Sequence, residues 1–119
     1  MGCAAPGQPH CEGLGDGTNL DFDFGATPNI FHIGSRLVIG VGHKSGVYHV
    51  FDSRTGEAVR RQQLFVPKPN GGESGIQWGT SYDGTHVYVA SWLADPGTLF
   101  ALNPAAGNIV WSHPKSAGR

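Results

Sequence analysis

The strongest constraint on the fold is a segment that the chain contains twice. Residues 46–60 read GVYHVFDSRTGEAVR, and residues 97–111 read GTLFALNPAAGNIVW. With an offset of 51 residues, Gly46 and Gly56 of the first copy align with glycines of the second copy. A repeat of this period indicates a supersecondary unit that is built more than once along the chain.

Each copy predicts a β-hairpin. Apolar and aromatic residues at 47–51 and 99–102 predict a first strand. A polar turn follows, Asp-Ser-Arg-Thr-Gly or Asn-Pro-Ala-Ala-Gly, in which Asp or Asn caps the turn and Gly supplies a positive φ. A second strand is expected at 58–65 and at 109–112.

Two further strands are expected before each hairpin. Segments 36–41 and 86–91 are apolar, and each follows a short turn that contains glycine. Segments 24–31 and 76–82 lie upstream of those turns. Four short strands per unit and a period of about 50 residues predict a blade of a β-propeller.

The chain is therefore expected to be all-β, with two four-stranded antiparallel blades of a β-propeller. Because no ring closes with fewer than about four blades, two blades predict a fragment of a longer protein. The alternative is a small sandwich of eight strands that folds alone. The expected units are a Gly/Pro-rich irregular segment at 1–20, a blade at 21–65, a connecting loop at 66–75, a second blade at 76–114 and a tail at 115–119.

The composition agrees with β structure and argues against several partners. Nineteen Gly and eight Pro leave no window with a helical stripe, and a charged fraction of only 14% is typical of stacked sheets. The net charge is −1 with the charges scattered, so neither nucleic acid nor an anionic membrane is expected as a partner. The sequence contains no apolar run of about 18 residues, so no membrane-spanning helix is expected. The first residues lack the apolar region of a signal peptide.

Cys3 and Cys11 lie in the Gly/Pro-rich stretch, and two interpretations of them stay open. A disulfide would contribute about 2.5 kcal/mol in the chain-entropy model and would be typical of an oxidising compartment. The alternative is two free thiols in a loop. The six histidines have no HExxH or other ligand spacing, which predicts strand and turn residues rather than metal ligands.

Polar side chains are expected to gather at one end of the two blades. In a four-stranded antiparallel blade, the segment that leads into the first strand and the turn between the second and third strands lie at the same end. A polar pocket near a propeller axis is a natural ligand site, although each of these residues also has a purely structural interpretation. The residues sorted to this end are Asp21, Asp23, His43, Lys44, Ser45, Glu73, Ser74, Gln77 and Trp78.

The repeat resembles a motif of a known family. The pattern Ala-x-Asp-x-x-Thr-Gly-x-x-x-Trp, present with substitutions at 50–60 and 101–111, is similar to the tryptophan-docking repeat of pyrroloquinoline quinone (PQQ) dehydrogenases. The stretches LDFDFGATP, LVIGVGHKSGVYHVFDSRTGE and GGESGIQWGTSYDG, in this order, look most like the polyvinyl alcohol dehydrogenase branch. The resemblance covers residues 20–114. It implies that the two blades are a fragment of an eight-bladed β-propeller. It also implies a quinoprotein that oxidises an alcohol by hydride transfer to PQQ, with Ca²⁺ ligands largely outside this segment.

The resemblance also implies roles for four residues. Asp21 matches the catalytic base, and Lys44, just before Ser-Gly, matches the cation that contacts the quinone oxygens. Gln77 and Trp78 match an Asn-Trp pair that contacts the cofactor. Leu20 stands where the family has Trp, and Gln77 stands where it has Asn. A carboxylate suits proton abstraction from the alcohol, and a lysine suits stabilisation of a developing oxyanion.

Further properties follow from the same resemblance. It implies a small or polymeric alcohol as substrate, a cytochrome c as electron acceptor, and a periplasmic or secreted location. The competing class is a non-catalytic propeller of the same repeat type that acts as a protein-binding scaffold or sensor ectodomain. Such a protein has no reason to keep Asp21, Lys44 and Gln77 together at one end.

Overall fold

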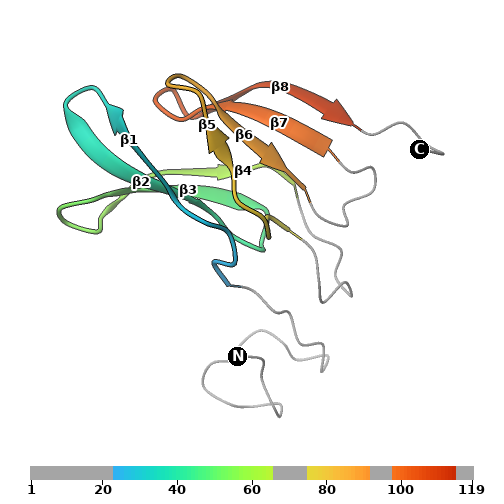
Figure 1. Ribbon diagram of the computed structural model, residues 1–119, viewed down its shortest axis with the longest axis horizontal. Helices are drawn as coiled ribbons and strands as arrows, with labels where there is room; N and C mark the ends of the chain where they lie inside the picture. The colour runs from blue at the N-terminus through green and yellow to red at the C-terminus, as the bar shows by residue number, and fades with distance from the viewer. Residues whose placement is uncertain (1–22, 66–74, 92–97, 115–119) are drawn as a thin grey trace, which may run out of the picture.

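The structure, a computed structural model, describes residues 23–65, 75–91 and 98–114. These residues form two four-stranded antiparallel sheets that follow one another along the chain (Figure 1). The described residues contain no helix, which confirms the expected all-β class. The first sheet contains β1 (Asn29–Ile33), β2 (Arg36–Gly42), β3 (Val47–Asp52) and β4 (Ala58–Gln63). The second sheet contains β5 (Ser81–Tyr82), β6 (Val87–Ala90), β7 (Thr98–Asn103) and β8 (Asn108–Pro114).

Every strand pairs with its neighbour in sequence. The strand orders are β1-β2-β3-β4 and β5-β6-β7-β8, so no strand of one sheet is inserted into the other. This up-and-down order is the order found in propeller blades. The two sheets are therefore propeller-like repeated units, as the 51-residue offset predicts.

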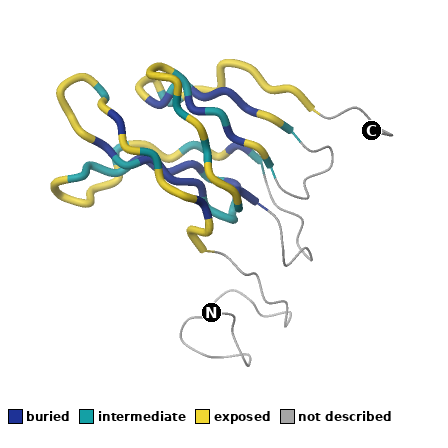
Figure 2. The backbone as a smooth tube through the Cα atoms, in the orientation of Figure 1, coloured by how far each residue is buried: buried dark blue, intermediate teal, exposed yellow. Residues whose placement is uncertain are grey.

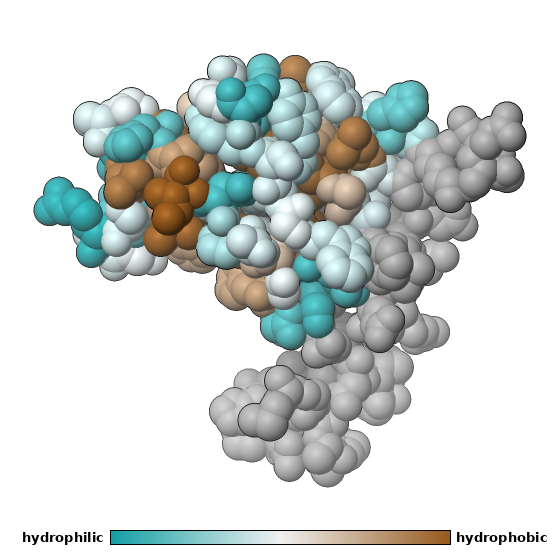
Figure 3. All heavy atoms as spheres, viewed as in Figure 1, coloured by the Kyte–Doolittle hydropathy of each residue, from teal (hydrophilic) through white to brown (hydrophobic). Residues whose placement is uncertain are grey.

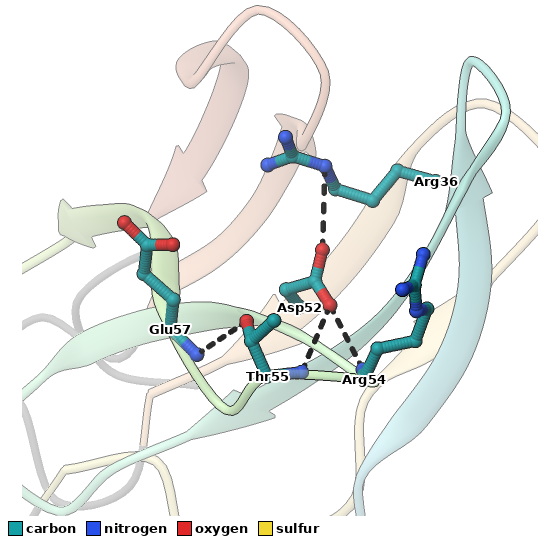
Figure 4. A network of polar contacts seen from close by, with 5 residues as sticks. All are labelled: Arg36, Asp52, Arg54, Thr55 and Glu57. Carbon is teal, nitrogen blue, oxygen red and sulfur yellow. Dashed lines mark hydrogen bonds and ion pairs between the residues drawn. The ribbon is translucent and has the colours of Figure 1, made fainter.

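The turn between β3 and β4 is held by Asp52. Its carbonyl oxygen accepts a hydrogen bond from the Gly56 N–H at 2.9 Å, and its Oδ1 accepts from the N–H groups of Arg54 and Thr55 at 2.8 and 3.2 Å. The Arg36 guanidinium lies 3.4 Å from the other carboxylate oxygen (Figure 4). The Arg54 N–H, followed by the Thr55 N–H and Arg36, holds the pKa of Asp52 below its usual 3.8.

The turn between β7 and β8 repeats this geometry with an amide in place of the carboxylate. The carbonyl oxygen of Asn103 accepts from the Gly107 N–H at 2.8 Å, and its Oδ1 accepts from the N–H groups of Ala105 and Ala106, both at 3.1 Å. Gly56 and Gly107 have φ values of 73° and 77°. The predicted turn chemistry is confirmed in both copies, because an Asp or Asn oxygen and a positive-φ glycine do the same work in each.

The two sheets pack face to face over a shared apolar core. The ring of Phe31 on β1 stacks on that of Tyr82 on β5, with centroids 4.5 Å apart. The core follows the middle of the strands, and the turns after β1, β3 and β5 are mostly exposed, whereas the β2–β3 turn is partly buried (Figure 2). The first sheet contributes Phe31, Val38, Tyr48 and Val50, and the second contributes Val87, Val89, Phe100 and Leu102, with Ile76 also buried there.

Four expected strands are shorter than predicted: those expected at 58–65 and 86–91 each lose two residues, to Ala58–Gln63 and Val87–Ala90, and two others begin much later than expected. The strand expected at 24–31 begins at Asn29, and the strand expected at 76–82 is reduced to Ser81–Tyr82. In both cases the preceding residues bond to the β2–β3 turn instead of to a neighbouring strand. The carbonyl oxygen of Asp23 and the N–H of Ile76 both bond to that turn, which removes them from the ladder.

Candidate functional site

Three chain segments meet at one end of the sheets: the segment before β1, the β2–β3 turn and the segment before β5. They lie together at the lower edge of the sheets in Figure 1. The Lys44 N–H donates to the carbonyl oxygen of Asp23 at 3.0 Å, and the Ile76 N–H donates to the carbonyl oxygen of His43 at 3.3 Å. The turn is thus held between the two leading segments, as the blade geometry predicts.

Lys44 forms an ion pair with Asp23. The Lys44 Nζ lies 3.2 Å from Asp23 Oδ1 and 3.3 Å from Oδ2. The lysine side chain is only 15% exposed, whereas the aspartate side chain is 49% exposed. Partial burial of the ammonium group strengthens its attraction to the carboxylate relative to a fully solvated pair. The pair therefore fixes a cationic group at this end of the sheets.

Glycines bring the backbone of the second sheet against Lys44. A Cβ on Gly75 would lie 1.8 Å from the Lys44 carbonyl oxygen, and Gly75 has a φ of 103°. A Cβ on Gly25 would lie 3.4 Å from Lys44 Cε and 3.8 Å from the Gln77 carbonyl oxygen. This close approach places Gln77 beside the ion pair, and only glycine fits at Gly75.

Gln77 carries the least satisfied polar group of this end. Its Nε2 is buried and has no hydrogen-bond partner within the described residues. Leaving such a donor unpaired costs about 1–3 kcal/mol, so an acceptor from a water molecule or a ligand is expected beside it. The adjacent Trp78 is 60% exposed, which leaves an indole at the same end.

An aromatic cluster lies beside this site on the first sheet. The Phe24 ring centroid lies 4.7 Å from that of His43, 5.3 Å from that of His49 and 6.3 Å from that of Phe51, each edge to face. His49 also stacks on Phe51 at 5.7 Å. The repeat carries a signal for this cluster, which the strand pattern alone does not: His49 lies 51 residues before Phe100, a residue of the core.

Hydrogen bonds and burial favour neutral histidines in this cluster. Nδ1 of His43 accepts from the Ser45 N–H at 3.1 Å and lies 2.6 Å from the Ser45 hydroxyl, which assigns the ring proton to Nε2. Burial lowers the pKa of His43; the carboxylate of Asp23 raises it, and Arg61 and Lys44 lower it further. Burial, together with Arg61 and His43, also lowers the pKa of His49.

Of the residues sorted to this end by sequence, the structure brings together Asp23, His43, Lys44, Ser45 and Gln77. Trp78 follows in the same segment. Asp21, the residue matched to a catalytic base, lies outside the described residues, as do Glu73, Ser74 and both cysteines. Across 23–65, 75–91 and 98–114, no three His, Cys, Asp or Glu side chains are grouped to hold a metal ion.

The groups at this end suit a planar ligand rich in oxygen: a lysine, a carboxylate, an amide donor without an acceptor and an exposed indole.

No protein-family model matches the chain, and no curated protein matches it significantly. Among the described residues, no helix is long and apolar enough to cross a membrane.

Proposed function

We propose that this chain is part of a PQQ-dependent alcohol dehydrogenase similar to polyvinyl alcohol dehydrogenases, with its two sheets as consecutive blades of an eight-bladed propeller. The observation that carries the proposal is the buried Nε2 of Gln77, which has no acceptor in the described residues and lies at the same end as Lys44. PQQ is a planar quinone with carboxylate and carbonyl oxygens. It would provide an acceptor for the amide and an anion for the lysine.

The donor set at this end fits such a cofactor. Lys44 would contact the quinone oxygens, the Gln77 amide would donate to a cofactor oxygen, and the Trp78 indole would contact the ring plane. When bound, PQQ supplies the electron acceptor for hydride removed from the alcohol. The resemblance assigns most of the Ca²⁺ ligands to blades outside this segment.

The two aspartates of the segment before β1 have different roles in this proposal. Asp21 accepts the proton of the alcohol, since it matches the base of the family. Asp23 is a positioning residue, because its carboxylate holds the Lys44 ammonium group at 3.2 Å. The substrate would be a small or polymeric alcohol, the electron acceptor a cytochrome c, and the location periplasmic or secreted.

One observation favours a second function, that of a non-catalytic scaffold or sensor ectodomain. The Lys44–Asp23 pair satisfies the lysine within the chain, and the contact between Gly75 and Lys44 ties the two sheets together. Both contacts stabilise the fold without a ligand. In this alternative the polar end is a structural joint.

Alcohol-dependent dye reduction separates the two functions. The protein that carries these blades in a complete ring is loaded with PQQ and Ca²⁺ and supplied with alcohols of different size. Asp21→Asn should lower turnover by at least about two to three decades, the scale for losing one group that acts on the transition state. Asp23→Asn makes the same chemical change two residues away, and it should lower turnover much less than Asp21→Asn, because it only weakens the hold on Lys44.

The possible outcomes assign the site. Loss of activity in Asp21→Asn alone supports the proposed dehydrogenase. Loss in Asp23→Asn alone moves the base to Asp23, and wild-type turnover in both variants favours the scaffold.

A further inference from the structure

At one edge of the junction between the two sheets, a side chain of the first sheet covers a turn of the second sheet. Arg60 of β4 reaches the second sheet, where its Nη2 donates to the carbonyl oxygen of Ala105 at 2.7 Å. A Cβ on Gly107, in the same turn, would lie 3.1 Å from Arg60 Cδ. The missing side chain at Gly107 therefore leaves the room that Arg60 occupies.

The first sheet has the same turn, but nothing in the described residues lies over it. Gly56 matches Gly107 in φ and in its hydrogen bond to the first residue of the turn. No heavy atom lies within 4 Å of the position that a Cβ on Gly56 would take. The turn thus offers an open place of the kind that Arg60 fills on the second sheet.

The outer face of the first sheet, turned away from the second, repeats a pattern that the second sheet buries. Ile39 pairs with Phe51 and Val41 pairs with His49, so the side chains of each pair lie on one face. Val41 and His49 are buried, with the Phe24 ring against His49 and Phe51, whereas Ile39 and Phe51 are half-buried. On the same face, Ile30 is 68% exposed, and hydrophobic side chains gather over β1 and β2 (Figure 3). The matching pairs of the second sheet, buried against the first sheet, are Val87–Leu102 and Val89–Phe100.

The outer face of the second sheet, turned away from the first, resembles the inner face of the first sheet, which forms the other half of the junction. Trp111 pairs with Ala101 as Arg60 pairs with Val50, and both pairings are followed by a β-bulge. Trp111 is 44% exposed, and its ring lies 6.1 Å from that of Tyr88. Trp111 is therefore placed to lie over a turn of a further sheet, as Arg60 does over the second sheet.

We propose that a second copy of this chain docks head to tail, with the outer face of its second sheet on the outer face of the first sheet and its Trp111 over Gly56. The two faces fit because each repeats one half of the junction that the chain already forms. A large apolar face with a central tryptophan is typical of an interaction surface. The inference concerns the 119-residue chain by itself and does not depend on the quinone site; in a longer propeller, neighbouring blades would take the place of the second copy.

Head-to-tail contacts leave one face of each copy unused, so they extend into rings or filaments. A ring of the usual size, with about four to eight blades, would contain about two to four copies. The assembly should therefore stop at a small, defined mass.

Mass measurement over a range of concentrations tests the association of the 119-residue chain. By multi-angle light scattering, the wild-type mass should rise from 12.6 kDa towards about two to four times that value as concentration increases. Trp111→Ser should weaken association by about tenfold or more, as expected for truncating a central tryptophan. Ile109→Ser is the matched control, because Ile109 lies on the same strand but pairs with Leu102 of the inner face.

A mixing experiment tests the head-to-tail geometry. Leu37→Glu places a charge on the outer face of the first sheet, and Gly56→Asn fills the open turn with a residue that tolerates positive φ. Each should be monomeric alone, as Trp111→Ser should be, because each lacks one of the two faces. An equimolar mixture of Trp111→Ser with either variant should form a 1:1 complex. Trp111→Ser retains the outer face of the first sheet, and its partner retains the outer face of the second sheet. Formation of the complex also shows that both variants are folded.

Several results would overturn the inference. One is a wild-type mass of 12.6 kDa at about 1 mM, where an association worth only about 4 kcal/mol would be visible. Others are equal weakening by Ile109→Ser and Trp111→Ser, association that Trp111→Ser leaves unchanged, and variants with wild-type circular dichroism that stay monomeric when mixed.

Discussion

Asn29 and Thr80 lie 51 residues apart, the offset of the repeat, and hydrogen-bond to each other across the two sheets. The Asn29 Nδ2 donates to the Thr80 carbonyl oxygen at 2.9 Å, and the Thr80 hydroxyl donates to Asn29 Oδ1. The Tyr48 hydroxyl also donates to Asn29 Oδ1, at 3.2 Å. One side-chain amide on β1 therefore links the first sheet to the segment before β5.

Replacing this amide should destabilise the junction. Asn29→Ala leaves the hydroxyl groups of Tyr48 and Thr80 without their acceptor, so the free energy of unfolding should fall by about 1–3 kcal/mol. Urea denaturation at low protein concentration measures this loss. Asn29→Asp, which keeps an acceptor at Oδ1, should lose less than Asn29→Ala; equal losses would contradict the role given to that oxygen.

A second prediction uses two glycines with nearly the same backbone. Gly75 has a φ of 103° and Gly84 has a φ of 102°. At Gly84 a Cβ would meet nothing within 4 Å, so Gly84→Ala should lose only the strain of positive φ, about 1–3 kcal/mol. At Gly75 the Cβ would collide with the Lys44 backbone, so Gly75→Ala should lose considerably more. Thermal or urea unfolding of both variants gives the comparison, and equal losses would show that the close approach is not required.

The hairpin turns could be predicted from the sequence, whereas the paths of the segments before β1 and β5 could not. The turns at Asp52 and Asn103 were predictable because their hydrogen bonds join residues close in sequence. The segments before β1 and β5 were predicted as strands because their apolar pattern extends that far. Backbone bonds from Asp23 and Ile76 to a distant turn take them out of the ladder, and a strand pattern carries no signal for such contacts.

The candidate site shows the same limit. Strand topology predicted that Asp23, Lys44 and Gln77 would share one end of the sheets, since this follows from the direction of each strand. The pairing of Lys44 with Asp23 and the orphan Nε2 of Gln77 depend on side-chain conformations in loops. Loop side chains have no periodic pattern from which such contacts can be read.

The pH dependence of stability provides a third prediction. Burial lowers the folded-state pKa values of His43 and His49 below the ordinary 6.5, with Arg61 adding to the lowering at both rings. The unfolded chain therefore binds protons first as pH falls. The free energy of unfolding should be constant near pH 7 and above, and should decrease as pH falls below about 6.5 through the lowered values. Asp23 opposes this effect at His43, and Lys44 adds to it.

Urea unfolding between pH 5 and about 8 measures this dependence, the range in which histidine titrates. His49→Phe should reduce the loss of stability at acid pH. The substitution introduces phenylalanine, the residue present 51 positions later in the second copy of the repeat. His32→Gln on the exposed part of β1 is the control and should leave the dependence as in the wild type. A profile that His49→Phe leaves unchanged would show that the buried ring does not cause the loss.

A fourth prediction concerns Arg60 and its contact with the Gly107 turn. Arg60→Ala removes the hydrogen bond to Ala105 and the packing of the side-chain stem, and should lower the free energy of unfolding by about 0.5–1.5 kcal/mol. Arg60→Trp, the residue at the equivalent position 111, should retain most of the wild-type stability because an indole also covers a glycine turn. Urea midpoints of the two variants decide this, and a tryptophan variant less stable than the alanine variant would contradict it.

Equilibrium binding of PQQ in the presence of Ca²⁺, followed by the change in cofactor absorbance, tests the proposed site most directly. Binding to the protein that carries these blades in a complete ring should be saturable. Lys44→Ala and Gln77→Leu should each weaken it by about tenfold or more, the scale for losing one charged or buried polar contact. Asp21→Asn should leave binding nearly intact, and so should Gln62→Leu, a matched glutamine on β4. Absence of saturable binding, or wild-type affinity in both Lys44→Ala and Gln77→Leu, would contradict the assignment of a quinone site to this end of the sheets.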